Sequence, residues 1–348
     1  MKELDKKELK QMIQSGHINF LIGAGCSTEY LNVLNNIENE MNQPEKEEQA
    51  RKKYYQLIKL SKDAIKKEQA AIKEKEEQLE ETRNNYEHFL QSWLETVSKR
   101  SLDIVNKQVN IFTTNFDMFL EDSCERLGIP YNDGFSGRIK PKFDVANFNK
   151  IEKYKSLQFD NTSAIPLFNI IKLHGSISWK IEGKEIERKE IVYSDGSHIA
   201  DDLNEKTGDD FKEGYKKIAV INPTAEKHFE TTLDTNYASM LRKFSLELEK
   251  ENSLLMVIGF SLEDKHIKTL LYGVMKSNPT LVVCYFSYPK YDTDKLEEAK
   301  HPNLYVISPE NNPHCKKECQ CFNETARYLD QICNPERRTN IEENPKTE

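Results

Sequence analysis

Three short polar motifs, each at the end of an apolar run, constrain the fold of this chain most. They read NFLIGAGCS at 19–27, VNIFTTNFD at 109–117 and IIKLHGS at 170–176. Short apolar runs that end in turn residues are typical of strands buried in a parallel sheet. Their polar ends would share the carboxyl edge of that sheet, where open α/β sheets bind ligands. The sequence therefore predicts a ligand site, of a kind that suits nucleotide processing, built from strand ends.

The rest of the chain continues the alternation of strands and helices. Further apolar runs read KIAVINP, LLMVIGFS, LVVCYFS and LYVIS, with helical segments among them. This pattern predicts an α/β fold with a doubly wound parallel sheet. Residues 131–165 are expected to be rich in loops, and residues 180–215 to form a hairpin and a loop. We expect one domain over 1–334 and a disordered polar tail over 335–348.

A Lys/Glu-rich stretch interrupts this pattern. It has no glycine or proline between Pro44 and Arg100, and its apolar residues recur at helical spacing (Leu57, Leu60, Ala64, Ile72 and Leu79). We therefore expect a helical insertion at about 38–104. Two interpretations stay open: the apolar stripe packs on its own domain, or it forms a surface for oligomers or a partner protein.

Composition and charge narrow the classes of function. The formal net charge of −8 does not favour nucleic-acid binding by bulk electrostatics, although direct binding through a local basic face stays open. No apolar run approaches the ~18 residues of a membrane span, so no membrane association is expected. The N-terminus, MKELDKKELKQ, is too charged for a signal peptide. We expect a cytoplasmic protein whose seven cysteines are reduced thiols.

The glycine turn Gly23-Ala24-Gly25 follows the first strand and is expected to precede a helix. Glycines let the backbone approach a pyrophosphate, and a helix N-terminus supplies amide donors and a positive dipole. Ser27 would add a hydroxyl donor. A plain strand–helix turn explains this motif equally well.

The second motif, Thr113-Thr114-Asn115-Phe116-Asp117, has more polar groups than a helix cap requires. Capping by Asn115 or Asp117 is the simpler interpretation. The chemical one makes Asn115 a group that positions water and a ribose hydroxyl, with Asp117 supplying negative charge or orienting the amide.

His174 ends the third apolar run and is followed by Gly175, which is expected to leave one side of the histidine open. A histidine there is either structural or a general base near neutral pH. A fourth turn, Gly259-Phe260-Ser261, is either a strand–helix connection or a second backbone cradle. The cysteines at 315, 319 and 321 have no standard zinc spacing, so no metal is expected and their role stays open.

In this order, GAGCS, TTNFD, KLHGS and GFSL resemble the motifs of the sirtuin superfamily. The resemblance implies a Rossmann-like, NAD-binding sirtuin fold over residues ~18–310. By motif, it implies that Gly23, Ala24, Gly25, Ser27 and Thr114 bind NAD, as do Gly259 and Ser261 on the adenosine side. Asn115, Asp117 and His174 are then the catalytic residues.

Three departures refine the resemblance, and one is the long charged insertion that separates GAGCS from TTNFD. Deacylating sirtuins carry two C-x-x-C zinc pairs after the histidine, whereas residues 175–283 contain no cysteine, and TEYLNVLNN replaces their Gly/Pro/Arg segment. The chain looks more similar to sirtuin-like domains of bacterial antiphage systems, which hydrolyse NAD. This implies an NAD glycohydrolase that releases nicotinamide and ADP-ribose and defends by NAD depletion. It also implies a homo-oligomer, with a HerA-type ATPase or another phage-sensing protein as partner.

Two other functions stay open. The chain is an NAD-dependent protein deacylase, or a non-enzymatic scaffold that senses NAD or ADP-ribose. Turnover separates them, since a deacylase consumes NAD only with an acyl peptide and a scaffold binds without releasing nicotinamide.

Overall fold

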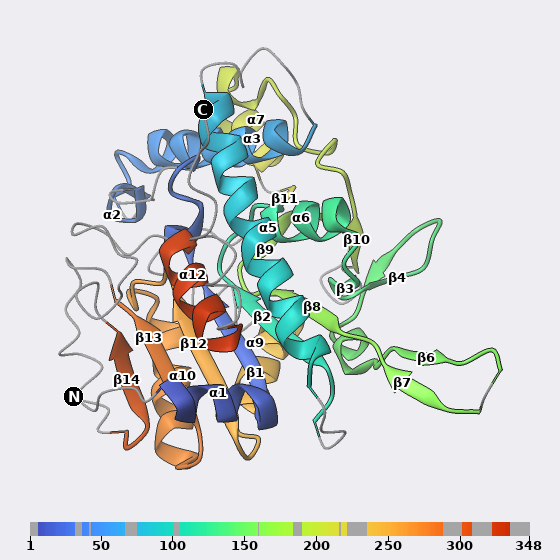
Figure 1. Cartoon of the computed structure of the whole chain (residues 1–348). Coiled ribbons are helices and arrows are strands. Elements are labelled where there is room, and N and C mark those ends of the chain that lie inside the picture. Colours follow the sequence, from blue (N-terminus) through green and yellow to red (C-terminus); the bar gives the residue numbers. More distant parts are fainter. Residues whose placement is uncertain are drawn as a thin grey trace, which may run out of the picture.

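The computed structural model describes residues 6–31, 37–41, 43–66, 75–100, 105–158, 160–183, 190–215, 217–220, 235–287, 301–307 and 322–334 (Figure 1). The predicted tail at 335–348 and the cysteines at 315, 319 and 321 lie outside these residues, and so does Ile72 of the predicted stripe. Among the described helices, none has the length and apolar character needed to cross a membrane.

Seven parallel strands form the central sheet, in the order β14-β13-β12-β1-β2-β8-β3. From β1 the chain passes to β2, then to the edge strand β3 and back to β8 between them. It returns to the other side of β1 at β12 and continues outward through β13 and β14. This confirms the predicted doubly wound parallel α/β fold. The strands are β1 His17–Ile22, β2 Gln108–Thr113, β3 Tyr131–Asn132, β8 Leu167–Lys172, β12 Ser253–Ile258, β13 Val282–Phe286 and β14 Leu304–Ile307.

Helices cover both faces of the sheet because alternate strand residues point to opposite sides. Phe20 and Ile22 of β1 join one apolar cluster, whereas Leu21 joins another. The first cluster packs on α1, α5, α6 and α12, and α5 and α12 run side by side across this face (Figure 1). The second packs on α9 and α10. These helices are α1 Lys6–Ser15, α5 Glu76–Ser98, α6 Phe119–Leu127, α9 Thr235–Leu248, α10 Lys265–Ser277 and α12 Phe322–Cys333.

Two long helices are described within the predicted helical stretch, and they differ in the core to which they mainly contribute. Helix α3 (Glu47–Lys66) places Tyr55 and Ile58 against the smaller sheet, whereas α5 places Tyr86 and Trp93 in the core of the central sheet. Of the predicted stripe, Ala64 and Leu79 are buried in the main core, and Leu57 and Leu60 pack against the cores of their own chain. The stripe therefore packs within the chain, and the homo-oligomer stays a prediction from the family resemblance.

A second, antiparallel sheet has the order β11-β9-β10-β5-β4, of which only the hairpin of β9 and β10 agrees with the hairpin expected within 180–215. The KIAVINP run contributes β11 to this sheet, so its expected place in the parallel sheet is wrong. Most strands of the antiparallel sheet have only two to four residues, too few to show alternation in the sequence. Its strands are β4 Phe135–Ser136, β5 Lys142–Phe143, β9 Gly175–Glu182, β10 Glu190–Tyr193 and β11 Ile218–Val220. The remaining elements are α2 Ile37–Met41, α7 Gly208–Tyr215 and the hairpin of β6 Lys153–Lys155 and β7 Thr162–Ala164.

Three buried asparagines pair across the centre of the main sheet. Asn19, Asn110 and Asn169 occupy matching positions on β1, β2 and β8. Asn110 Nδ2 donates to Asn19 Oδ1 at 2.9 Å, and Asn169 Nδ2 donates to Asn110 Oδ1 at 2.8 Å. A one-residue slip of any strand would leave these amides unpaired in the core, so the row fixes the register of the strands that carry the site.

Replacing Asn110 with alanine is expected to lower the free energy of unfolding by about 2–4 kcal/mol, because it orphans buried amide groups of both neighbours. Urea titration measures this change. Asn161→Ala, at an exposed position of the β6–β7 turn, is the control and should change stability by less than about 0.5 kcal/mol. Equal effects of the two substitutions would contradict the role of the row.

Candidate nucleotide site at the sheet switch point

Two glycine turns meet where the strand order reverses, at the carboxyl ends of β1 and β12. Gly25 N donates to Gly259 O at 2.9 Å, and Gly23 N donates to Ile258 O at 3.0 Å. Gly259 has a φ of +64°, and a Cβ there would lie 2.7 Å from Cys26 N. A Cβ on Gly23 would overlap the Gly259 carbonyl. The two turns therefore pack closely enough to require glycine, at the crevice where open α/β sheets bind ligands.

The segment after the first turn differs from the prediction. The expected helix is present only as a short 3₁₀ helix, Ala24–Ser27, which follows Gly23 directly. A single tight turn aligns few peptide dipoles and cannot give the charge of an α-helix N-terminus. Ser27 is only 2% exposed, and its hydroxyl donates to Asp117 Oδ2 at 3.1 Å instead of pointing outward.

Asn115 lies beneath these turns with a fixed amide. Its Nδ2 donates to the carbonyl oxygen of Gly23 at 3.1 Å. A carbonyl only accepts hydrogen bonds, so this contact identifies the NH₂ end of the side chain. The other end, Oδ1, is buried and has no partner among the described residues. A buried acceptor without a partner is costly, which makes this oxygen the best candidate in the site for accepting a ligand hydroxyl or a water.

Asp117 and Tyr86 complete this buried layer. Asp117 Oδ1 accepts from Phe119 N at 3.2 Å, so both carboxylate oxygens have protein donors. Burial raises the pKa of Asp117, and the nearby Lys172 ammonium opposes that rise. Tyr86, from α5, places its hydroxyl 2.9 Å from Ser27 Oγ and 3.4 Å from Asn115 Nδ2. Tyr86 was not among the predicted site residues, because helical spacing does not show which side chain of a helix contacts the end of a distant strand.

A buried ion pair contacts the backbone of the TTNFD segment at Asp117. Lys172 Nζ lies 3.1 Å from Glu121 Oε2, with the two side chains 2% and 5% exposed, and it also donates to the backbone oxygen of Asp117. Burial is the largest effect on Glu121 and raises its pKa to about 7, although Lys172 opposes it. The sequence signal for this ion pair is Lys172, a charged residue inside the apolar run IIKLHGS.

His174 and Asp264 bridge the crevice. His174 follows β8 and Asp264 follows β12, and strands β1 and β2 lie between them. The histidine Nε2 is nevertheless 2.9 Å from Asp264 Oδ2. Three strand spacings span roughly 14 Å, so the two side chains meet across the ends of β1 and β2. Asp264 Oδ1 also accepts from His266 N and Ile267 N, which fixes the carboxylate as the cap of α10.

The expectation that Gly175 leaves one side of His174 open to a ligand is wrong. Gly175 is buried with a φ of +78°, and a Cβ there would overlap the carbonyl oxygen of Ala219 on β11. Glycine is needed because the backbones of β9 and β11, which pair within the smaller sheet, approach closely here.

The predicted site residues therefore form two layers. Those of the upper layer are partly exposed and lie at strand ends: Ala24, Gly25, Thr114, His174 and Ser261. Those of the lower layer are buried: Gly23, Ser27, Asn115, Asp117 and Gly259. Next to Ser261, Leu262 adopts a φ of +62°, a left-handed conformation that is strained for leucine and typical of functional turns.

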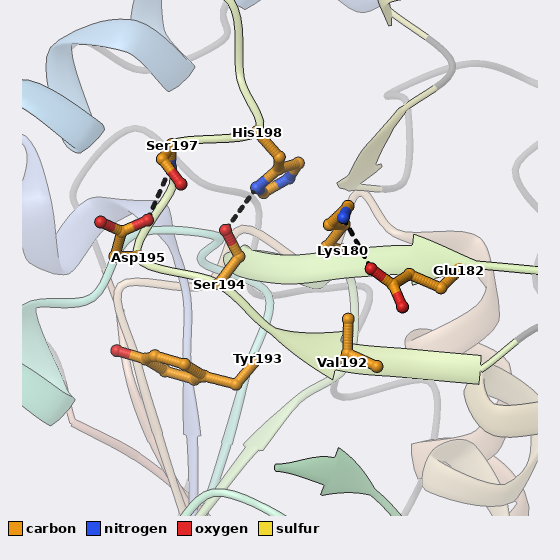
Figure 2. Close-up of a pocket in the computed structure, with 8 residues that line it drawn as sticks. All are labelled: Lys180, Glu182, Val192, Tyr193, Ser194, Asp195, Ser197 and His198. Carbon is orange, nitrogen blue, oxygen red and sulfur yellow. Dashed lines mark hydrogen bonds and ion pairs between the residues drawn. The ribbon is translucent and has the colours of Figure 1, made fainter. Parts of the chain in front are cut away.

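A separate polar groove lies on the smaller sheet, and none of its lining residues is a predicted site residue (Figure 2). Ser194 Oγ lies 2.8 Å from His198 Nδ1, and Lys180 Nζ lies 2.6 Å from Glu182 Oε1. Burial is the largest effect on His198 and lowers its pKa to about 4, so the ring is neutral near pH 7. The groove is lined by Lys180, Glu182, Val192, Tyr193, Ser194, Asp195, Ser197 and His198.

Comparison with solved structures finds low-identity likenesses to Sir2 enzymes. One, from work on the mechanism and regulation of Sir2 enzymes, has 12% identity and a TM-score of 0.45 over 97% of this chain and 100% of that chain. A mutant Sir2 with a p53 peptide and NAD has 13% identity and a TM-score of 0.45, over 94% and 97% of the two chains. At such values these likenesses carry no argument about function.

Comparison with curated proteins finds no match. A family model, the SIR2-like domain, matches residues 109–307, more than half of the 348-residue chain. The match includes the TTNFD, KLHGS and GFSL segments, whereas the first glycine turn precedes it. The chain belongs to the SIR2-like domain family.

Proposed function

We propose that this protein binds NAD at the switch point and hydrolyses the bond between nicotinamide and ribose. The observation that carries the proposal is the buried Oδ1 of Asn115, an acceptor without a partner among the described residues, beneath the turn of Gly23. A ribose hydroxyl or a water is a donor that fits it. NAD is the substrate, and the products are nicotinamide, ADP-ribose and a proton.

The proposed hydrolysis needs few catalytic groups from the protein. Nicotinamide in NAD is already a cationic leaving group, so its departure needs no general acid, unlike ordinary glycoside hydrolysis. The site must hold the ribose, deliver water to the anomeric carbon and accept one proton. Asn115 Oδ1 would orient the water or a ribose hydroxyl, and His174 would accept the proton. Asp264 would orient the imidazole and stabilise its protonated form, as carboxylates beside catalytic histidines do.

Asp264→Asn tests the role of the carboxylate. Asparagine keeps an oxygen for the cap of α10 but loses the negative charge beside His174. Nicotinamide release is expected to fall about 10–100-fold, with little change in melting temperature. The matched control is Asp144→Asn, which alters the cap of the short helix Val145–Asn149 and should leave the rate unchanged. A rate unaffected by Asp264→Asn would remove the carboxylate from the mechanism.

One experiment separates the hydrolase from its alternatives. Purified protein is incubated with NAD, with and without an acetylated peptide, and nicotinamide, ADP-ribose and acetyl-ADP-ribose are separated by chromatography. Nicotinamide and ADP-ribose without peptide support the hydrolase. Release that requires the peptide, and yields acetyl-ADP-ribose, identifies a deacylase. Saturable binding of ADP-ribose without turnover identifies a sensing scaffold.

We also propose, from the family resemblance alone, that NAD depletion serves antiphage defence. Unregulated NAD loss would harm a resting cell, so a homo-oligomer and a partner such as a HerA-type ATPase would control the activity. Adding phage DNA or the partner ATPase to the NAD assay, with light scattering in parallel, tests this. A monomer that is fully active alone would contradict it.

A further inference from the structure

We propose that Tyr86 of helix α5 is a positioning residue that fixes the amide of Asn115, so that Asn115 Oδ1 faces the ligand. This inference rests on the proposed function for its catalytic meaning. It assigns to α5, which the sequence marks only as part of a charged helical stretch, a direct part in the nucleotide site.

Four side chains form a hydrogen-bonded chain beneath the glycine turns. Ser27 Oγ donates to Asp117 Oδ2 at 3.1 Å, and its contact with the Tyr86 hydroxyl is 2.9 Å. The Tyr86 oxygen lies 3.4 Å from Asn115 Nδ2. All four side chains are at most 6% exposed, so water does not compete with these contacts.

The direction of the chain follows from which groups can donate. As a carboxylate Asp117 only accepts, so the single proton of Ser27 is used there. Tyr86 must therefore donate to Ser27, which leaves the Tyr86 oxygen to accept from Asn115 at 3.4 Å. Ser27 Oγ, at 3.5 Å, is the other side-chain acceptor within reach of this amide among the described residues. The second amide proton of Asn115 goes to the Gly23 carbonyl at 3.1 Å. With both NH₂ protons engaged, the amide cannot flip and Oδ1 stays an acceptor.

Packing holds the Tyr86 ring in place independently of its hydroxyl. The ring stacks on Phe119 of α6, with centroids 5.7 Å apart and an interplanar angle of 18°. It also packs against the ring of Phe322 on α12, with ring centroids 4.8 Å apart. Burial raises the pKa of Tyr86 far above its usual value, so the hydroxyl keeps its proton. Tyr86→Phe should therefore remove one hydroxyl and leave the packing unchanged.

The test compares Tyr86→Phe with Tyr30→Phe in the full chain. Tyr30 is equally buried and also packs on Phe119, but its hydroxyl donates to Leu60 O at 3.4 Å, outside the chain of hydrogen bonds. In Tyr86→Phe we expect kcat for nicotinamide release to fall about 10-fold and KM for NAD to change less than about twofold. Tyr30→Phe should change neither. Equal kcat values for wild type and Tyr86→Phe, or equal losses in both variants, would overturn the inference.

A second readout does not depend on activity. In protein labelled with ¹⁵N-asparagine, the side-chain amide signal of Asn115, assigned with Asn115→Ala, should move in Tyr86→Phe and stay in place in Tyr30→Phe. An unmoved signal overturns the positioning role. If the wild type releases no nicotinamide, the proposed function fails, and this signal still decides whether Tyr86 orients Asn115.

Discussion

Replacing His174 or Asn115 with alanine is expected to slow nicotinamide release from NAD by about 10²–10⁴-fold. His174→Ala removes the group proposed to accept the proton. Asn115→Ala removes the buried acceptor oxygen together with the donor to Gly23. Steady-state release of nicotinamide, followed by chromatography over a range of NAD concentrations, measures both losses.

The controls separate chemistry from folding. Both residues lie at strand ends, so neither truncation opens a large cavity in the apolar core. The melting temperature of His174→Ala should therefore stay within a few degrees of the wild type. Asn115→Ala also orphans the buried Gly23 carbonyl, so its activity is measured well below its own melting temperature. His198→Ala, in the groove of the smaller sheet, removes another partly buried histidine and should keep full activity. Unchanged nicotinamide release in both His174→Ala and Asn115→Ala would exclude this site.

Lys172→Met is expected to lower the free energy of unfolding by about 3–5 kcal/mol at pH 8 and by clearly less at pH 5. The substitution leaves the Glu121 carboxyl buried beside Asp117 without its ammonium partner. At pH 5 Glu121 takes up a proton and the uncompensated charge disappears. Urea unfolding at the two pH values measures the difference.

The sign of this pH dependence follows from the pKa of Glu121. Burial raises it to about 7 in the folded protein, above the value of 4.5 for an ordinary glutamate. The contribution of this group to stability is therefore complete below about pH 4.5 and is lost as the pH rises through about 7. Lys172 lowers this pKa, so removing the lysine raises it further and enlarges the loss at pH 8.

Two variants control for Lys172→Met. Adding Glu121→Gln removes the orphaned charge, so the double variant should recover much of the stability at pH 8. Lys142→Met breaks an exposed ion pair with Glu190 and should cost less than about 1 kcal/mol at either pH. A loss for Lys172→Met that is the same at pH 5 and pH 8 would contradict the assigned role of Glu121.

The sequence by itself determined the central sheet, apart from its two-residue edge strand β3, and the edge of that sheet where the candidate site residues lie. Apolar runs that end in GAG, TTNFD, LHGS and GFS specify buried parallel strands, and parallel strands carry their polar ends to one edge. This is a local pattern, readable within about ten residues of each motif. The helical nature of 45–100 was readable for the same reason, from spacing and the absence of glycine and proline.

Only the tertiary structure decided which of the candidate site groups are partly exposed and which are buried in contact with one another. Ser27 and Asp117 read as surface donors and acceptors in their motifs, yet Ser27 contacts Asp117, 90 residues away, and Tyr86, 59 residues away. The pairing of His174 with Asp264 spans strands far apart in the sequence. Hydrogen bonds between distant segments depend on how helices pack over a sheet. A local sequence pattern does not specify that packing.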